Sequence, residues 1–314
     1  MNRIIKYSFA LSILIAAASS PAVNAIALID LRSENIDYMS VDLRWKDNSS
    51  FGDLQILQRK KSAGTQIKTV VRFPHKADFY TDLGLESNTT YNYRLATREA
   101  NGMSSWAELT VRTKVNPHTG VFNVKNFGAK GNGSTNDTAA IRAAIAEALK
   151  NGGTVYFPAG TYAVAPDPKA GHIFYIEKGN IFFKGEGPDK SIISCYASGL
   201  RNPETSWDYT DSGNLVRGMA FLLPMDVTTW HSNFVFEDLR VTGNTRPTGE
   251  TAWWTNEQKE NGWDFSHKGI YLGLKNVNVF MRNCEWDNFR GEILYSGDAW
   301  TKKFKLVDCI STRI

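Results

Sequence analysis

Apolar and polar positions follow three different patterns along this chain. Over residues 26–114 they alternate in short stretches, such as 39–45, 54–56, 70–73 and 91–95, with turn residues between them. Over residues 137–150 apolar side chains recur at every third or fourth position, and after residue 162 short apolar runs return at longer intervals. Alternation predicts the short strands of a β-sandwich, and the three-to-four spacing predicts one amphipathic helix.

The predicted helix has clear start and stop signals. Ile141, Ile145 and Leu149 form its apolar face, and we expect the side chain of Asn136 to cap its first turn. Asp137 then places a negative charge at the positive end of the helix dipole, and two glycines end the helix. Such a helix is roughly 20 Å long, which is enough to cover one end of a β-solenoid.

The apolar runs after residue 162 repeat loosely, as the rungs of a coil do. Four runs begin at residues 180, 233, 278 and 303, and the last three are followed six residues later by Leu239, Cys284 and Cys309. Offsets of 45 and 25 residues between those three runs predict one or two rungs each, with Leu239, Cys284 and Cys309 stacked inside. A disulfide between Cys284 and Cys309 is the alternative. Three cysteines make no disulfide framework, and no Cys/His cluster predicts a metal site.

The first 25 residues have the pattern of a signal peptide. Arg3 and Lys6 precede an apolar run over residues 10–18, and small residues at 23 and 25 form a cleavage site before Ile26. The run is short for a membrane anchor, so we expect export to the periplasm or the extracellular space and no membrane span. Removal of the peptide lowers the formal net charge from +4 to +2. That balance gives no support to nucleic acid as a partner.

The segment around the predicted helix resembles a known family. The resemblance rests on Phe127-Gly128-Ala129-Lys130-Gly131-Asn132-Gly133, on Asn136-Asp137-Thr138 and on Gly152-Gly153-Thr154-Val155 with Phe157-Pro158 and Gly160. These residues are similar to the N-terminal cap of the pectate-lyase-like superfamily. The resemblance implies an all-β fold for residues 121–314, a right-handed parallel β-helix with an N-terminal capping α-helix, and work on carbohydrate. Fold alone does not name the reaction.

Residues 26–114 resemble a fibronectin type III domain. Tyr91 matches the tyrosine of its E–F corner, Trp45 matches its core tryptophan, and Asn101-Gly102 matches its F–G turn. The resemblance implies spacing or contact with a protein or cell surface. Residues 115–120 then form a short linker, and residues 121–314 form the β-helix, which we expect to be incomplete at its C-terminal end because the chain stops just after a rung.

Two long insertions between rungs are the first place to expect function. Residues 198–218 contain Trp207, and residues 243–268 contain Trp253, Trp254 and Trp263. Indole faces suit sugar rings, so we predict that these tryptophans bind substrate. The alternative is that they pack the loops onto the coil.

The densest polar patch supplies the catalytic candidates, which are His267, Lys268, Asp287, Arg290, Glu292 and Asp298. A glycosidase needs two carboxylates, for which Glu292 with Asp298, or Asp287 with Glu292, are the candidates. A lyase or epimerase needs a cation at the uronate carboxylate and a base, which Lys268, Arg290 or His267 supply. Clustered carboxylates suit calcium as the cation that neutralises the uronate carboxylate, and no other cofactor is predicted. A structural salt bridge is the alternative role for each residue.

The sequence therefore predicts a secreted enzyme that cleaves a uronate-containing polysaccharide by lyase or hydrolase chemistry. The paired-aspartate, Gly-His-Gly and Arg-Ile-Lys signatures of polygalacturonase-like glycosidases are absent, as is the Asp-Pro-His-Glu motif of C5-epimerases. The alternative is a non-catalytic, glycan-binding or adhesin-type β-helix that uses the tryptophan loops.

Overall fold

A computed structural model describes nine stretches of the chain. They are residues 29–46, 53–74, 77–99, 102–165, 172–195, 219–243, 268–289, 292–296 and 303–312. The predicted signal peptide lies outside them. The chain separates into two compact units, the first made of Met1–Arg32, Leu43–Tyr80 and Thr90–Val111, and the second of Ser33–Asp42, Thr81–Thr89 and Arg112–Ile314. The domain boundaries proposed above stay predictions.

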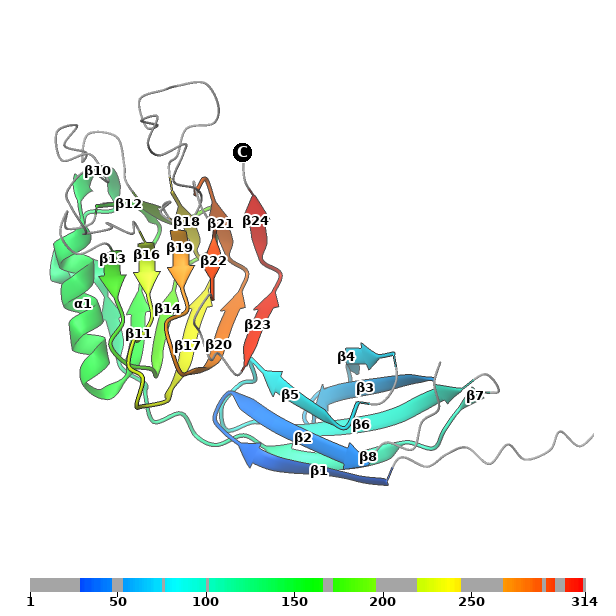
Figure 1. Cartoon of the computed structure of the whole chain (residues 1–314). Coiled ribbons are helices and arrows are strands. Elements are labelled where there is room, and N and C mark those ends of the chain that lie inside the picture. Colours follow the sequence, from blue (N-terminus) through cyan, green and yellow to red (C-terminus); the bar gives the residue numbers. More distant parts are fainter. Residues whose placement is uncertain are drawn as a thin grey trace, which may run out of the picture. The chain divides into compact units, whose positions relative to one another are not determined.

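The N-terminal strands form two sheets (Figure 1). A three-stranded sheet has the order β1 (Ile29–Ile36), β2 (Ser40–Lys46), β5 (Phe79–Leu83). The other has the order β4 (Lys68–Phe73), β3 (Leu54–Lys61), β6 (Thr90–Glu99), β7 (Gly102–Met103), with β8 (Ala107–Arg112) paired to β6. Strand β3 is antiparallel to both β4 and β6.

Alternating apolar residues supply the core of this module, as the period of two predicts. Leu57 and Leu95 face each other in the register of β3 and β6, and both are fully buried. Leu43 and Trp45 on β2 are buried too, so the predicted core tryptophan is confirmed. The antiparallel sandwich is thus observed, whereas its assignment to the fibronectin type III family stays a prediction.

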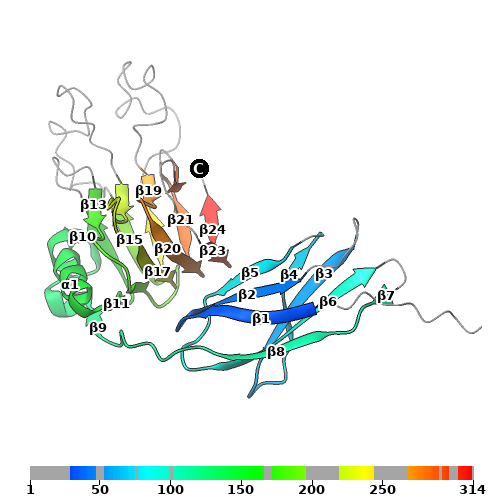
Figure 2. The ribbon, with the colours of Figure 1, turned by 60° about the horizontal axis from the view of Figure 1, so that its bottom comes forward.

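The strands after residue 120 form a coil of three parallel sheets, seen side by side in Figures 1 and 2. Coil sheet 1 contains β9 (Val121–Asn123), β11 (Gly153–Tyr156), β14 (Ile181–Lys184), β17 (His231–Glu237), β20 (Asn276–Arg282) and β23 (Phe304–Val307). Coil sheet 2 contains β10 (Asn132–Asn136), β12 (Gly160–Val164), β15 (Ser191–Cys195), β18 (Arg240–Thr242), β21 (Glu285–Asp287) and β24 (Ile310–Thr312). Coil sheet 3 contains β13 (His172–Tyr175), β16 (Met219–Leu222), β19 (Lys268–Tyr271) and β22 (Leu294–Tyr295). The chain visits the three sheets in turn, so each circuit is one rung.

The register of coil sheet 1 confirms the predicted rungs. Ile181 pairs with Phe234, Phe234 with Val279, and Val279 with Phe304, each the residue after the predicted start of its run. Two residues further on, the buried rings of Phe183 and Phe236 stack with their centres 4.9 Å apart. Identical inward positions on successive rungs therefore build one continuous apolar core.

Asparagines in the left-handed conformation recur at the start of the rungs in coil sheet 1, one just before β14 and the others inside β17 and β20. Asn180, Asn233 and Asn278 have φ of 58°, 66° and 57°. The side-chain amide of Asn278 donates to Asn233 Oδ1 at 2.8 Å, and that of Asn233 donates to Asn180 Oδ1 at 2.9 Å. These three residues form what we call the asparagine ladder. On the next turn Leu239 and Cys284 are buried in the core and Cys309 packs against it, as predicted for an inward stack.

One helix covers the first end of the coil (Figure 2). In α1 (Thr138–Asn151) the residues Ile141, Ile145 and Leu149 face the coil core, as predicted. The cap position is held by Asp137, one residue after the predicted Asn136, and Asp137 makes no side-chain cap bond, whereas the predicted bond between the Asn136 side chain and the first turn is present.

Asp137 has another role. Its two carboxylate oxygens accept from the backbone N–H groups of Lys130 and Gly131 at 2.7 and 2.9 Å, and the residue is 1% exposed. The carboxylate therefore closes the glycine loop before α1, while Asn136 Oδ1 accepts from the N–H of Thr138 at 3.0 Å. The short 3-10 helix η1 (Val124–Phe127) ends at Gly128, just before that loop. No helix among the described residues is long and apolar enough to cross a membrane.

Candidate functional site

The connections between rungs differ greatly from corner to corner of the coil. The turn from coil sheet 1 to coil sheet 2 takes only two residues at Asp238-Leu239 and again at Asn283-Cys284. The connections from coil sheet 2 to coil sheet 3 include residues 196–218 and 244–267, which lie outside the described part of the chain. Functional loops are usually presented by rigid elements, so the strand ends at this corner are the place to look for a site.

Seven of the ten predicted site residues lie outside the described part of the chain. Trp207, Trp253, Trp254, Trp263, His267, Arg290 and Asp298 all lie outside the described residues. Their predicted roles stay predictions. Three candidates remain to be placed, and they are Lys268, Asp287 and Glu292.

Lys268 is the first residue of β19, directly after the tryptophan-rich connection. Its side chain is 2% exposed, and its ammonium lies 2.8 Å from Glu292 Oε2. The same ammonium lies 3.5 Å from the ring centre of Tyr295 on β22. A buried ammonium is costly unless charge and π electrons replace its lost water, and here a carboxylate and an aromatic face do so.

The parallel register explains why these residues meet. His172, Met219 and Lys268 pair across the first positions of β13, β16 and β19. The backbone oxygen of Glu292 accepts from the N–H of Gly269 at 3.1 Å, so Glu292 continues this row on the next rung. The prediction that neighbouring rungs bring Lys268 beside the 287–298 segment is confirmed for Glu292. Its side chain is 40% exposed, so a ligand in solvent can reach it.

Asp287 has a different partner from those predicted. It is the last residue of β21, 1% exposed, and its Oδ2 accepts a short hydrogen bond from the guanidinium of Arg240 on β18. The Nε of Arg240 also lies 3.8 Å from Glu285 Oε1. Asp287 Oδ1 is buried and has no hydrogen-bond partner among the described residues. The register explains this pairing. Arg240 lies directly opposite Glu285, and Asp287 follows two residues later on the same face of β21, so the guanidinium reaches both carboxylates.

The two carboxyl groups on β21 have unequal environments. Burial raises the pKa of Glu285, the charge of Asp287 raises it further, and Arg240 works in the opposite direction. Asp287 meanwhile has Arg240 as its direct partner. Two neighbouring carboxyl groups, one of them with a raised pKa, are an arrangement that acid–base chemistry uses.

Sequence reasoning missed Arg240, Glu285 and Tyr295. A signal for the first two was present, because the 45-residue offset that aligns Leu239 with Cys284 also aligns Arg240 with Glu285. Among the residues that the structure describes, no group of three or more His, Cys, Asp or Glu side chains could hold a metal ion.

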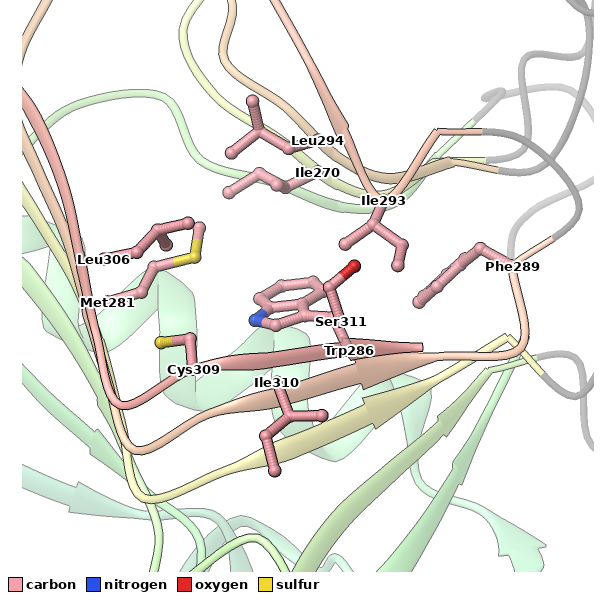
Figure 3. Close-up of a pocket in the computed structure, with 10 residues that line it drawn as sticks. All are labelled: Ile270, Met281, Trp286, Phe289, Ile293, Leu294, Leu306, Cys309, Ile310 and Ser311. Atoms are coloured by element: carbon pink, nitrogen blue, oxygen red, sulfur yellow. The ribbon is translucent and has the colours of Figure 1, made fainter. Parts of the chain in front are cut away.

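An apolar cavity of about 400 Å³ lies inside the last rungs (Figure 3). Its lining is Ile270, Met281, Trp286, Phe289, Ile293, Leu294, Leu306, Cys309, Ile310 and Ser311. Figure 3 shows the Trp286 indole between Met281 and Ile293, with the Cys309 thiol beside Met281. Apart from Cys309 and Ser311 the lining is apolar, and it contains no acidic or basic side chain that would bind an acidic substrate.

Comparisons with known proteins agree with the parallel β-helix described above. Residues 121–262 match the family model described as "Rhamnogalacturonase A/epimerase, pectate lyase-like". Alginate lyase 7 of Azotobacter vinelandii is 48% identical over 73 residues, which are 23% of this chain and 8% of that protein. Mannuronan C5-epimerase AlgE1 of the same organism is 34% identical over 138 residues, which are 43% of this chain and 9% of that protein. The chain therefore spans under a tenth of the length of these two relatives.

A solved structure gives the fold independently. The family 28 exopolygalacturonase of Yersinia enterocolitica superposes with a TM-score of 0.55 at 15% identity, covering 91% of this chain and 60% of that one. At this level of identity the likeness identifies the fold alone.

Proposed function

Since the coil of this chain is a parallel β-helix and residues 121–262 match the pectate-lyase-like family model, we propose that the protein is a secreted enzyme that processes an acidic, uronate-containing polysaccharide. The reaction we propose is β-elimination at the uronate unit. The observation that carries it is the buried ammonium of Lys268, held by the exposed carboxylate of Glu292 and by the face of Tyr295. Relatives named as an alginate lyase and a mannuronan epimerase support a uronate substrate.

Elimination makes two demands on a site. The carboxylate of the uronate must be neutralised, because only then does the proton on the neighbouring carbon become acidic enough to leave. A base must take that proton, after which its electron pair forms the new double bond and the glycosidic C–O bond breaks. The departing oxygen then takes a proton from solvent water.

Lys268 and Glu292 meet these demands. Lys268 is the first residue of β19, at the edge of coil sheet 3, and we propose that the substrate carboxylate approaches its ammonium at this edge. Glu292 lies 2.8 Å from that ammonium and 40% of its side chain is exposed, which lets it accept the proton from the same sugar. The face of Tyr295 packs against the ammonium, 3.5 Å from the ring centre.

Hydrolysis is the second candidate, and it is favoured by one observation. Glu285 has a raised pKa beside the arginine-bound Asp287, which suits a general acid paired with a carboxylate. The two candidates differ in product, since elimination gives unsaturated uronate and hydrolysis does not.

The test is an incubation with alginate, polygalacturonate and neutral glucans, following new reducing ends together with ultraviolet absorbance of unsaturated uronate. Variants Lys268→Met and Glu292→Gln are each expected to slow the rise in absorbance roughly 100-fold or more, as expected for loss of an acid–base group. Lys184→Met is the matched control, because Lys184 also pairs with a carboxylate on a neighbouring rung, Glu237 at 3.6 Å, but on coil sheet 1.

The outcomes separate the alternatives. Full activity in Lys268→Met would overturn the role of Lys268, and reducing ends without absorbance would move the assignment to Glu285 and Asp287. Tight binding with no product on any substrate would replace the enzyme with a glycan-binding protein.

A further inference from the structure

We propose that the N-terminal sandwich carries a second binding site for acidic polysaccharide, on the outward face of its five-stranded sheet. The uronate nature of the ligand rests on the proposed function, whereas the site itself rests on the residues below. We call this surface the basic face, and it consists of Gln58, Lys60, Asn92, Arg94, Trp106 and Thr110.

Strand register places these polar groups in rows across the sheet. Lys60 on β3 pairs with Asn92 on β6, and the hydroxyl of Thr110 on β8 donates to Asn92 Oδ1 at 3.0 Å. Gln58 pairs with Arg94 in the same way, two residues away on each strand and therefore on the same face. The face therefore presents an ammonium, an amide and a hydroxyl side by side, which are groups that bind sugar hydroxyls and carboxylates.

Arg94 is held in a fixed orientation. Its Nε donates to Gln58 Oε1 at 2.7 Å, and its guanidinium carbon lies 4.3 Å from the ring centre of Trp106. A planar guanidinium that is oriented by stacking keeps its terminal nitrogens aligned for two-point binding of a carboxylate. The entropy of ordering the side chain is thus already lost before a ligand arrives.

A shallow cavity of about 240 Å³ opens over these residues. Its lining is Arg59, Lys60, Ile67, Asn92, Tyr93, Arg94, Glu108, Leu109 and Thr110. The lining includes Lys60 and Arg94 of the basic face, together with Arg59 and the carboxylate of Glu108, and Ile67 is 47% exposed. Positive charge with apolar surface beside it is complementary to a uronate chain, in which carboxylates alternate with the C–H faces of sugar rings.

Protection of a sheet edge does not explain these charges. Edge strands commonly carry lysines and other charges to prevent pairing with another chain. Lys60 lies on β3, which has β4 on one side and β6 on the other, and Arg94 lies on β6, which has β3 on one side and β7 and β8 on the other. The cations are therefore in the middle of the sheet, where edge protection is not needed.

Nucleic acid is a poorer fit to this surface. Duplex binding uses many cations along a backbone that carries a charge every few ångströms. The basic face has only two cations, Lys60 and Arg94, and the carboxylate of Glu108 lines the same cavity. This low charge density suits a polysaccharide with one carboxylate per sugar.

The experiment is affinity electrophoresis of the full chain through gels containing polyuronate, with neutral glucan and DNA gels in parallel. The double variant Lys60→Gln/Arg94→Gln is expected to bind polyuronate roughly tenfold more weakly or worse, as for the loss of two charge-assisted contacts. Arg32→Gln/Arg44→Gln is the matched control, because it removes the same charge from the strands of the three-stranded sheet. Arg94→Lys keeps the charge but loses the planar fork, and it is expected to bind with intermediate affinity.

Each result has a defined meaning. An equal loss in the Arg32/Arg44 control, or binding to DNA as tight as to polyuronate, would overturn the site. A chain that degrades polyuronate but keeps its affinity in Lys60→Gln/Arg94→Gln would overturn this inference and leave the proposed function intact. A chain without turnover whose polyuronate affinity depends on Lys60 and Arg94 would do the reverse. Unchanged circular dichroism and thermal unfolding of the variants establish that the fold is retained.

Discussion

Replacement of Asn233 by alanine tests how the coil keeps its rungs in register. Asn233 is the central member of the asparagine ladder, 2% exposed, with φ of 66°. It accepts from Asn278 at 2.8 Å and donates to Asn180 at 2.9 Å. Alanine at this position loses both hydrogen bonds and must hold a left-handed conformation that its Cβ disfavours.

The magnitude follows from these two losses. Each buried hydrogen bond contributes about 1 kcal/mol net, and the amide of Asn278 left without an acceptor adds a desolvation cost of about 1 kcal/mol or more. The left-handed conformation costs an alanine roughly 1 kcal/mol. We therefore expect Asn233→Ala to lower the free energy of unfolding by roughly 3–4 kcal/mol. For a typical domain that is a large share of the total.

The assay is urea unfolding followed by tryptophan fluorescence and far-ultraviolet circular dichroism, with two companion variants. Asn233→Gly removes the hydrogen bonds but tolerates φ above zero, so it is expected to be less destabilised than alanine by about 1 kcal/mol. Asn283→Ala is the matched control, because Asn283 has φ of 49° and donates to Asp238 on the previous rung at 2.8 Å, but its side chain is exposed. Its expected loss is about 1–2 kcal/mol.

Equal losses at Asn233 and Asn283 would refute the reasoning, since burial of the ladder would then add nothing. Equal losses for the alanine and glycine variants of Asn233 would show that backbone conformation contributes no part of the cost.

Three further predictions follow from individual contacts. The neighbouring Cys284 side chain lowers the pKa of Cys309 to about 6, so Cys284→Ala should slow alkylation of Cys309 by iodoacetamide at pH 7 at least about tenfold; an unchanged rate measured by mass spectrometry contradicts this. Burial raises the folded-state pKa of Glu285, so its stabilisation is present below the unfolded pKa and is lost as pH rises through the folded one. Glu285→Gln should therefore gain stability relative to the parent between pH 4 and pH 7, and the opposite trend in urea midpoints would disprove it. Tyr162→Phe loses the bond from the hydroxyl to the backbone oxygen of Pro158 at 2.7 Å and should cost about 1 kcal/mol of unfolding free energy, which an unchanged urea midpoint would exclude.

The rungs were predictable from the sequence because each rung obeys two local demands at once. Inward positions need apolar residues, and the start of each rung in coil sheet 1 needs a residue that accepts a left-handed conformation, which asparagine does. Asn180, Asn233 and Asn278 each precede such an apolar run. The alignment of those signals fixes the register without knowledge of the rest of the chain.

The start of the cap helix shows where a local signal is ambiguous. An acidic residue before an amphipathic segment fits both a favourable charge at the helix dipole and a carboxylate that binds loop N–H groups. Asp137 does the second, because the glycine loop before it folds back and presents the N–H groups of Lys130 and Gly131. That fold-back is a tertiary event, which spacing along the helix does not encode.

The candidate site was predictable only in part for a related reason. Outward positions of a coil accept any polar residue, so a charged residue there carries no periodic signal. Lys268 and Glu292 were found because they lie in a dense polar segment, whereas Arg240 was overlooked because it stands alone in its own segment. Its pairing with Asp287 depends on which strands become neighbours.

The contrast between the two-residue turns and the long connections has an evolutionary consequence. The turn at Asp238-Leu239 recurs with the same length at Asn283-Cys284, and its residues are bound to neighbouring rungs. A deletion there would shift every later side chain relative to the core, so selection must hold that corner constant. The connections that follow coil sheet 2 carry no such constraint, and a duplication or recombination event can exchange one of them while the strands on either side stay in place. Descendants of such a coil would then differ in substrate at the corner between coil sheets 2 and 3, while the corner between coil sheets 1 and 2 would be inherited unchanged.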